Sequence, residues 1–123
     1  MTIPGYMGID LPVLEQAVIR WHHDRNLIHG STDQAQLAKL IEEVGELARA
    51  LRNEKSDANY QTADAIGDVL VVLINIALRN GLTLRTCLHR AFNDIKDRKG
   101  KMVDGIFIKE ENNGYPIYHG LSH

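Results

Sequence analysis

The feature that most constrains the fold is a polar stripe on the most apolar segment of the chain. Residues 60–80 predict one helix, ended by Gly81, because glycine readily takes the left-handed conformation that follows helices. Residues 69–77 are apolar almost all round, which is typical of a helix buried in a core. The stripe recurs at intervals of three, four and seven residues along one helical face and consists of Gln61, Asp64, Asp68, Asn75 and Arg79.

Buried carboxylates need a partner charge, a proton or a metal ion. The stripe therefore predicts a functional polar cleft on this helix. Two alternatives remain open from the residues alone. Asp64 and Asp68 could pair with basic residues of another helix, or this face could simply be in contact with water.

A second acidic group lies on the preceding helix, predicted over residues 32–53 with Ser31 or Thr32 as its N-cap. Its acids stand three or four positions apart on one patch and are Glu42, Glu43 and Glu46. Like charges at this spacing destabilise a helix by about 0.2–0.5 kcal/mol per pair, which a bound cation would offset. Taken alone, such a cluster is more often a solvated face, partly neutralised by Lys39 and Arg49. Gly45, which costs about 1 kcal/mol relative to alanine, suggests that another backbone or a ligand passes close by.

Two acidic groups on consecutive antiparallel helices can face each other and surround one or two divalent ions. Oxygen-only donors favour Mg²⁺, with Mn²⁺ as a possible substitute. A helical di-iron site requires Glu-x-x-His pairs, and neither helix contains a histidine. The usual partner of Mg²⁺ in proteins is a substrate phosphate.

A basic cluster closes the fourth predicted helix and consists of Lys96, Arg98, Lys99 and Lys101. These residues are equally consistent with charge capping of the helix C-terminus and with a clamp for polyphosphate oxygens. Nucleic-acid binding is a third possibility, but the net charge of −2 argues against it.

The remaining segments indicate an all-α, four-helix bundle-like fold in a single domain over residues 1–123. Helices are expected over residues 12–27, 32–53, 60–80 and 83–99. The pair Asp104-Gly105 between β-forming residues predicts a short hairpin or an extended C-terminal arm. Residues 1–11 and 112–123 are expected to be irregular arms. More apolar helix surface than one small core can hide predicts an oligomer.

The sequence also bears on the cellular compartment. The lone Cys87 cannot form an internal disulfide and is expected to be buried. The first ten residues lack the pattern of a signal peptide, and the longest apolar run, residues 69–74, is too short to cross a bilayer. We therefore expect a cytoplasmic protein with no membrane partner.

The acidic motifs resemble those of the MazG-like, all-α nucleoside triphosphate pyrophosphohydrolases. That family carries Glu-Glu-x-x-Glu, a spacer and then Glu-x-x-Asp; residues 42–46 match the first motif, and Asp68 matches the end of the second. Asn75 fits an asparagine that the family often carries seven residues later. The resemblance extends from Trp21 through Gln36 and Lys39 to residues 93–101. One position departs from it, since Ala65 stands where the family has glutamate, and neighbouring Asp64 is the expected substitute.

The resemblance implies Mg²⁺-dependent hydrolysis between the α- and β-phosphates of (deoxy)nucleoside triphosphates by a homodimer or homotetramer. The metal ligands that it implies are Glu43, Glu46 and Asp68, together with Asp64, which is expected to be a ligand or the base that orients the water. Glu42 is expected to be a further ligand or an acceptor for one. Contacts to phosphate are assigned to Lys39, Lys96, Arg98 and Lys101, and a contact to sugar or base to Asn75. Trp21 could stack on the base, but a role as an anchor in the core is the favoured interpretation. The main alternative is a non-catalytic module that binds a nucleotide or a partner helix; a purely structural bundle is the third.

Overall fold

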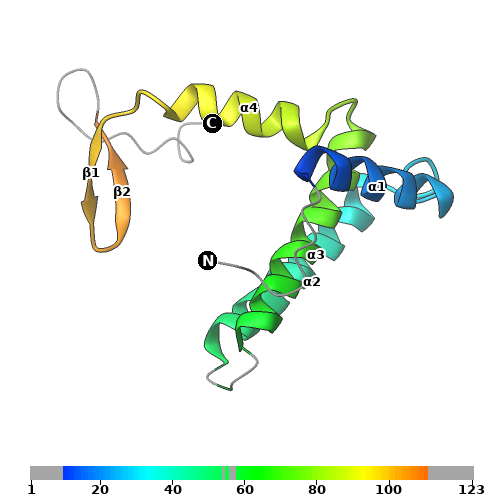
Figure 1. The fold of residues 1–123 in the computed structure, drawn as a ribbon, viewed down its shortest axis with the longest axis horizontal. Coiled ribbons are helices and arrows are strands. Elements are labelled where there is room, and N and C mark those ends of the chain that lie inside the picture. The colour runs from blue at the N-terminus through cyan, green and yellow to red at the C-terminus, as the bar shows by residue number, and fades with distance from the viewer. Residues whose placement is uncertain (1–9, 54, 56–57, 111–123) are drawn as a thin grey trace. The chain divides into compact units, whose positions relative to one another are not determined.

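The computed structural model describes residues 10–53, 55 and 58–110, in which four helices precede one hairpin (Figure 1). The elements are α1 (Leu11–Asp24), α2 (Asp33–Arg52), α3 (Ala58–Arg79), α4 (Leu84–Ile95), β1 (Gly100–Val103) and β2 (Ile106–Lys109). The four expected helices are therefore present. Contacts divide the chain into two compact units, residues 1–87 and 88–123, and each is described by itself.

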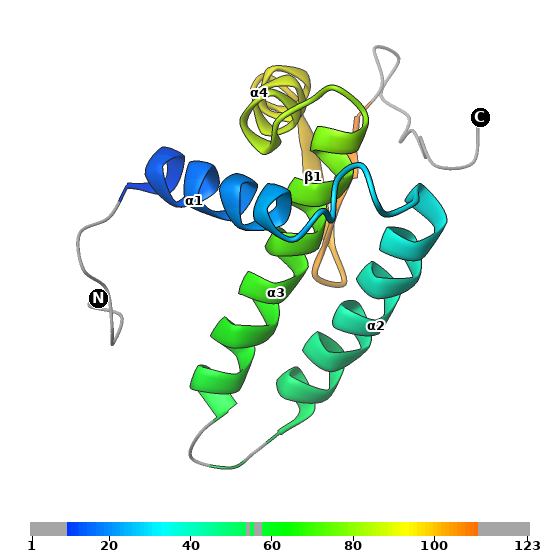
Figure 2. The same ribbon diagram turned by 90° about the vertical axis from the view of Figure 1, so that its right-hand side faces the viewer.

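Helices α2 and α3 form an antiparallel hairpin, the largest helix–helix contact of the first unit (Figure 2). Thr32 is the N-cap of α2, as expected, and its Oγ1 accepts a hydrogen bond of 3.0 Å from the Ala35 amide. Gly81, with φ +73°, follows α3 in the left-handed conformation that the sequence predicts. The buried residues of α3 outnumber those of every other helix described and are Ala65, Val72, Ile74, Asn75 and Ala77.

Helix α1 lies against α3 and is fastened to it by buried polar groups. The His22 Nε2 atom lies 2.9 Å from the Val71 carbonyl oxygen. Asn75 Nδ2 donates to the Leu27 carbonyl oxygen at 3.0 Å and lies 3.3 Å from His22 Nδ1. Helix α1 ends at Asp24, three residues earlier than predicted, because the chain turns back through Asn26 with φ +55°.

The start of α4 is anchored to α1 within the first unit. The buried Glu15 carboxylate lies 2.6 Å from Arg85 Nε and accepts from the Arg85 amide at 3.3 Å. This contact places a negative charge at the amino end of α4, where the helix dipole favours it. Cys87, in the same turn, is exposed, so the expectation of a buried cysteine was wrong for this chain.

The second unit contains the end of α4 and a two-stranded antiparallel hairpin. Gly100 pairs with Lys109 and Val103 with Ile106, which confirms the predicted hairpin. Asp104 and Gly105 both have positive φ, +52° and +79°, as a two-residue hairpin turn requires. Helix α4 ends at Ile95 rather than at Lys99 because the backbone extends from residue 100 to pair in this hairpin.

Helix α3 is long and apolar enough to cross a membrane by length and composition alone. Core helices of soluble proteins meet the same criterion. In this structure α3 packs along α2 and against α1.

Candidate metal-binding and catalytic site

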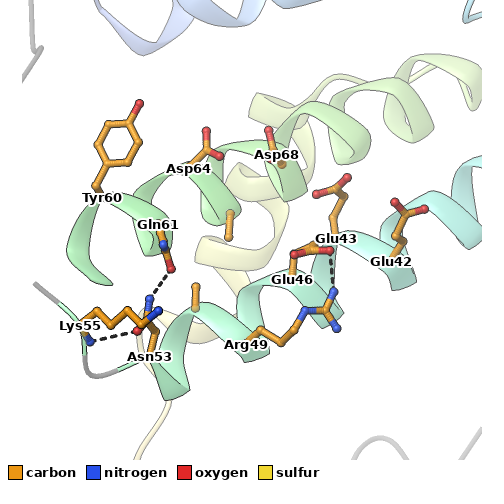
Figure 3. Close-up of a pocket in the computed structure, with 12 residues that line it drawn as sticks. Glu42, Glu43, Glu46, Arg49, Asn53, Lys55, Tyr60, Gln61, Asp64 and Asp68 are labelled. Atoms are coloured by element: carbon orange, nitrogen blue, oxygen red, sulfur yellow. Dashed lines mark hydrogen bonds and ion pairs between the residues drawn. The ribbon is translucent and has the colours of Figure 1, made fainter. Parts of the chain in front are cut away.

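A pocket of about 670 Å³ lies between α2 and α3, within the size range of small-molecule sites (Figure 3). All five carboxylates that the sequence singles out line it. Glu42, Glu43 and Glu46 come from α2, and Asp64 and Asp68 come from α3. The fold therefore brings the two predicted acidic groups to one cavity.

Basic residues of α2 itself partly neutralise the three glutamates. Lys39 Nζ lies 3.1 Å from Glu43 and 3.4 Å from Glu42, and these two carboxylates raise the pKa of Lys39. Arg49 Nη2 lies 2.5 Å from Glu46 Oε1. Glu43 is the most buried of the five acids, so its ion pair is the least screened by water.

The two aspartates of α3 differ from the glutamates in having no cation. In the part of the chain that the structure describes, neither Asp64 nor Asp68 forms an ion pair, which argues against structural pairing with another helix. Desolvation raises the pKa of Asp68, and the charges of Asp64 and then Glu43 raise it further, against a smaller lowering by Lys39. Negative charge therefore exceeds positive charge around Asp68.

The donor set fits a hard divalent cation, since it offers only carboxylate oxygens and an excess of negative charge. The spacing of these side chains, in contrast, does not form a ready metal site. Among residues 10–53, 55 and 58–110, no three His, Cys, Asp or Glu side chains lie close enough together to hold one ion. Binding of a metal would therefore require these side chains to move toward one another.

Ala65 occupies the buried position where the resemblance expects a glutamate. Both Ala65 and Ala50 line the pocket, and both are buried between the two helices. Asp64 is exposed to the pocket one residue earlier, on the same face as Asp68. This placement is compatible with the substitution expected from the sequence, and the role of Asp64 as a ligand stays a prediction.

The other predicted site residues lie elsewhere. Asn75 is completely buried and holds the turn after α1, so in this conformation its amide contacts protein atoms. Trp21 is 43% exposed outside the pocket lining, with the Arg25 guanidinium 4.4 Å from its ring centre. Of the predicted phosphate contacts, Lys39 pairs with the glutamates, and Lys96, Arg98 and Lys101 belong to the second unit.

Gln61, the first residue of the predicted polar stripe, also lines the pocket, as do Asn53, Lys55 and Tyr60, to which sequence reasoning assigned no role. Helical spacing could have identified two of them. Asn53 follows Glu46 by seven residues, and Tyr60 precedes Asp64 by four, so each shares a helical face with a predicted acid. They were missed because both stand at the ends of helices, next to the loop.

Comparisons with known proteins identify the family of the chain. Residues 31–103 match the model of the MazG nucleotide pyrophosphohydrolase domain. An uncharacterized 18.2 kDa protein in the rep-hol intergenic region of Haemophilus phage HP1 is 41% identical over 71 residues. The match covers 58% of this chain and 42% of the phage protein. No solved structure matches significantly. Since the family model spans most of the chain and includes both acidic groups of the pocket, the chain belongs to the MazG nucleotide pyrophosphohydrolase domain family.

Proposed function

We propose that the protein hydrolyses (deoxy)nucleoside triphosphates to the monophosphate and pyrophosphate, with Mg²⁺ as its metal and Mn²⁺ as a substitute. One observation carries the proposal: five carboxylates line a single pocket, and the two on α3 have no cation among the described residues. Such a pocket repels a bare polyphosphate and attracts one that arrives with divalent cations.

The proposed ligands are Glu43 and Glu46 on α2 together with Asp64 and Asp68 on α3. A bound magnesium ion supplies charge neutralisation at the phosphate oxygens and a water molecule of lowered pKa. Glu42 contacts Lys39 and lies at the edge of the five carboxylates, where its proposed role is to orient a metal ligand or a water molecule.

Lys39 has a second proposed task. Its ammonium holds Glu43 and Glu42 in the metal-free chain. If those carboxylates held a cation, the Lys39 ammonium would be available to contact a phosphate oxygen. In the second unit, Lys96, Arg98 and Lys101 stay a prediction as phosphate contacts, and Arg98 is paired 3.0 Å from Asp94.

A nucleotide panel tests this function directly. The protein is incubated with Mg²⁺ and the common ribo- and deoxyribonucleoside triphosphates, and pyrophosphate is measured. Pyrophosphate release that disappears in Asp68→Asn supports the proposal. No turnover of any nucleotide with Mg²⁺ or Mn²⁺ refutes it.

A second candidate is a non-catalytic nucleotide-binding module of the same fold. Two observations favour it: Ala65 replaces the glutamate that the resemblance expects, and no three described acids lie close enough to hold an ion. Tight nucleotide binding without pyrophosphate release would select this candidate. If the unmodified protein does release pyrophosphate, Asp64→Asn tests how it does so without a glutamate at position 65. Loss of turnover in that variant would show that Asp64 supplies the carboxylate that Ala65 lacks.

We also propose that the protein assembles as a homodimer or homotetramer. Helix α2 exposes apolar side chains at intervals of four, three and seven residues, which keep to one helical face as in a seam between paired helices: Leu37, Ile41, Val44 and Leu51. A Cβ atom at Gly45 would meet only Arg49, at 4.0 Å. No contact among the described residues therefore requires a glycine at position 45. A second helix that packed closely against this position would require one.

A further inference from the structure

The pocket has two chemically different ends (Figure 3). Glu42, Glu43 and Asp68 lie at one end. Asn53, Tyr60 and Gln61 lie at the other, where α2 finishes and α3 begins. The second end offers no carboxylate. Its two amides and aromatic ring, which we call the neutral end, lie beside Lys55, whose side chain also lines the pocket.

Helix geometry fixes how far apart the two ends are. Asn53 lies seven residues beyond Glu46, and Gln61 lies seven residues before Asp68. Seven residues of α-helix span about 10 Å, so two helical turns separate Asn53 from Glu46 and Gln61 from Asp68, whereas Asp64 lies only three residues after Gln61. Tyr60 is nearer, one turn from Asp64. This separation suits a ligand whose charged and uncharged parts are joined by a short linker.

An amide bridge holds the neutral end at a fixed width. Asn53 Nδ2 donates to Gln61 Oε1 at 2.5 Å, and Asn53 Oδ1 accepts from the Lys55 amide at 2.9 Å. Asn53 is also the C-cap of α2. The bridge therefore ties the last turn of α2 to the first turns of α3 and positions the residue next to Gln61.

That neighbouring residue is Tyr60, which is 76% exposed although it lines the pocket. Aromatic side chains contribute most when their rings are covered, and tyrosine is enriched where a ligand or partner covers it. A planar, uncharged ring system is the kind of group that stacks on tyrosine.

We infer that the neutral end, formed by Tyr60 beside the Asn53–Gln61 bridge, binds the base of the nucleotide whose phosphates lie at the carboxylates. The inference rests on the proposed function and adds the orientation of the substrate. Tyr60 stacks on the base, and the Asn53–Gln61 bridge positions Tyr60. Stacking accepts every base, so Tyr60 supplies affinity for nucleosides as a class.

Equilibrium binding by calorimetry tests the inference with two ligands in the presence of Mg²⁺. One is a nucleoside triphosphate analogue with a methylene group between the α- and β-phosphates; the other is inorganic tripolyphosphate, which has no base. Tyr60→Ala is expected to weaken binding of the analogue about 5- to 150-fold, the range for one stacked base. Tyr60→Phe keeps the ring and should retain most of the affinity. Tripolyphosphate should bind equally to all three proteins.

Two results would overturn the inference: unchanged affinity of Tyr60→Ala for the analogue, or an equal loss of affinity for tripolyphosphate. Trp21→Ala is the comparison variant, since Trp21 is the other candidate for stacking. A loss in Trp21→Ala with none in Tyr60→Ala would place the base elsewhere.

Kinetics separate this inference from the proposed function. If the base binds at Tyr60, Tyr60→Ala raises KM for every nucleotide about tenfold while kcat changes little, because the ring contacts no reacting atom. Pyrophosphate release with an unchanged KM in Tyr60→Ala refutes the base site alone. An absence of pyrophosphate release by the unmodified protein refutes the proposed function.

Discussion

Replacing Asp68 with asparagine is expected to stabilise the metal-free protein while abolishing its activity. Desolvation, and then the nearby charges of Asp64 and Glu43, raise the pKa of Asp68, although its side chain is exposed by surface area. Asparagine has nearly the same shape and no charge. The variant therefore removes a repulsion and leaves the packing of α3 in place.

The magnitude follows from the spacing on the helix. Asp64 and Asp68 form an i, i+4 pair, for which like charges cost about 0.2–0.5 kcal/mol. The remaining contributions, repulsion from Glu43 and attraction to Lys39, oppose each other. We expect a gain of about 0.2–0.5 kcal/mol, which raises Tm by about 1 to 2 °C in a domain of this size.

The pH dependence has a defined sign. Because the folded chain raises the pKa of Asp68, it binds this proton more tightly than the unfolded chain does. The contribution of Asp68 to stability is thus most favourable below its ordinary pKa and is lost as the pH rises through the raised value. The difference in Tm between Asp68→Asn and the unmodified protein should therefore be greatest at neutral pH and should decrease as the pH is lowered.

Thermal unfolding followed by circular dichroism, in EDTA and then in Mg²⁺, measures both effects. Mg²⁺ should raise Tm of the unmodified protein more than that of Asp68→Asn, which has lost a ligand. Asp94→Asn is the matched control, since Asp94 is an exposed aspartate paired with Arg98, and it should gain no stability. A lower Tm of Asp68→Asn in EDTA, or an equal Mg²⁺ shift in both proteins, would refute the reasoning.

Three further outcomes are expected. Glu43→Gln should abolish pyrophosphate release without loss of helical circular dichroism; near-normal rates would reject Glu43 as a ligand. Asn75→Ala should lower the free energy of unfolding by about 1–3 kcal/mol in a denaturant titration, because it leaves the part-buried Leu27 carbonyl oxygen without the amide of the buried Asn75; a change near zero would contradict this. Gly45→Ala should shift light-scattering mass toward the monomer if a second helix packs there, as should Ile41→Lys. An unchanged mass together with a Tm raised by the better helix former would place the oligomer contact elsewhere.

The sequence by itself determined the local elements and the faces of the helices. Helical periodicity is a property of neighbouring residues, so α2 and α3 were predicted nearly to their ends. The cap at Thr32, the glycine at 81 and the turn at Asp104-Gly105 are equally local and agree with the structure. Spacing alone also placed Asp64 and Asp68 on one face.

Only the tertiary structure divided the polar stripe of α3 into two parts with different tasks. Asp64 and Asp68 line the pocket along α2, whereas Asn75 is buried against the turn after α1. Arg79 Nε pairs with Asp33 at 3.0 Å, and its guanidinium also donates to the Ile28 carbonyl oxygen. Periodicity treats these residues alike because they share one face.

The physical reason is that burial depends on which distant segment covers each turn of a helix. Along its first half, α3 faces α2 and the pocket between them. Along its second half, α3 contacts the chain between His22 and Ile28. The same nonlocal dependence explains why Cys87 is exposed and why Tyr60 belongs to the pocket lining. The residue types indicated the chemistry of the site, and the packing of the helices decided which of them meet in the pocket.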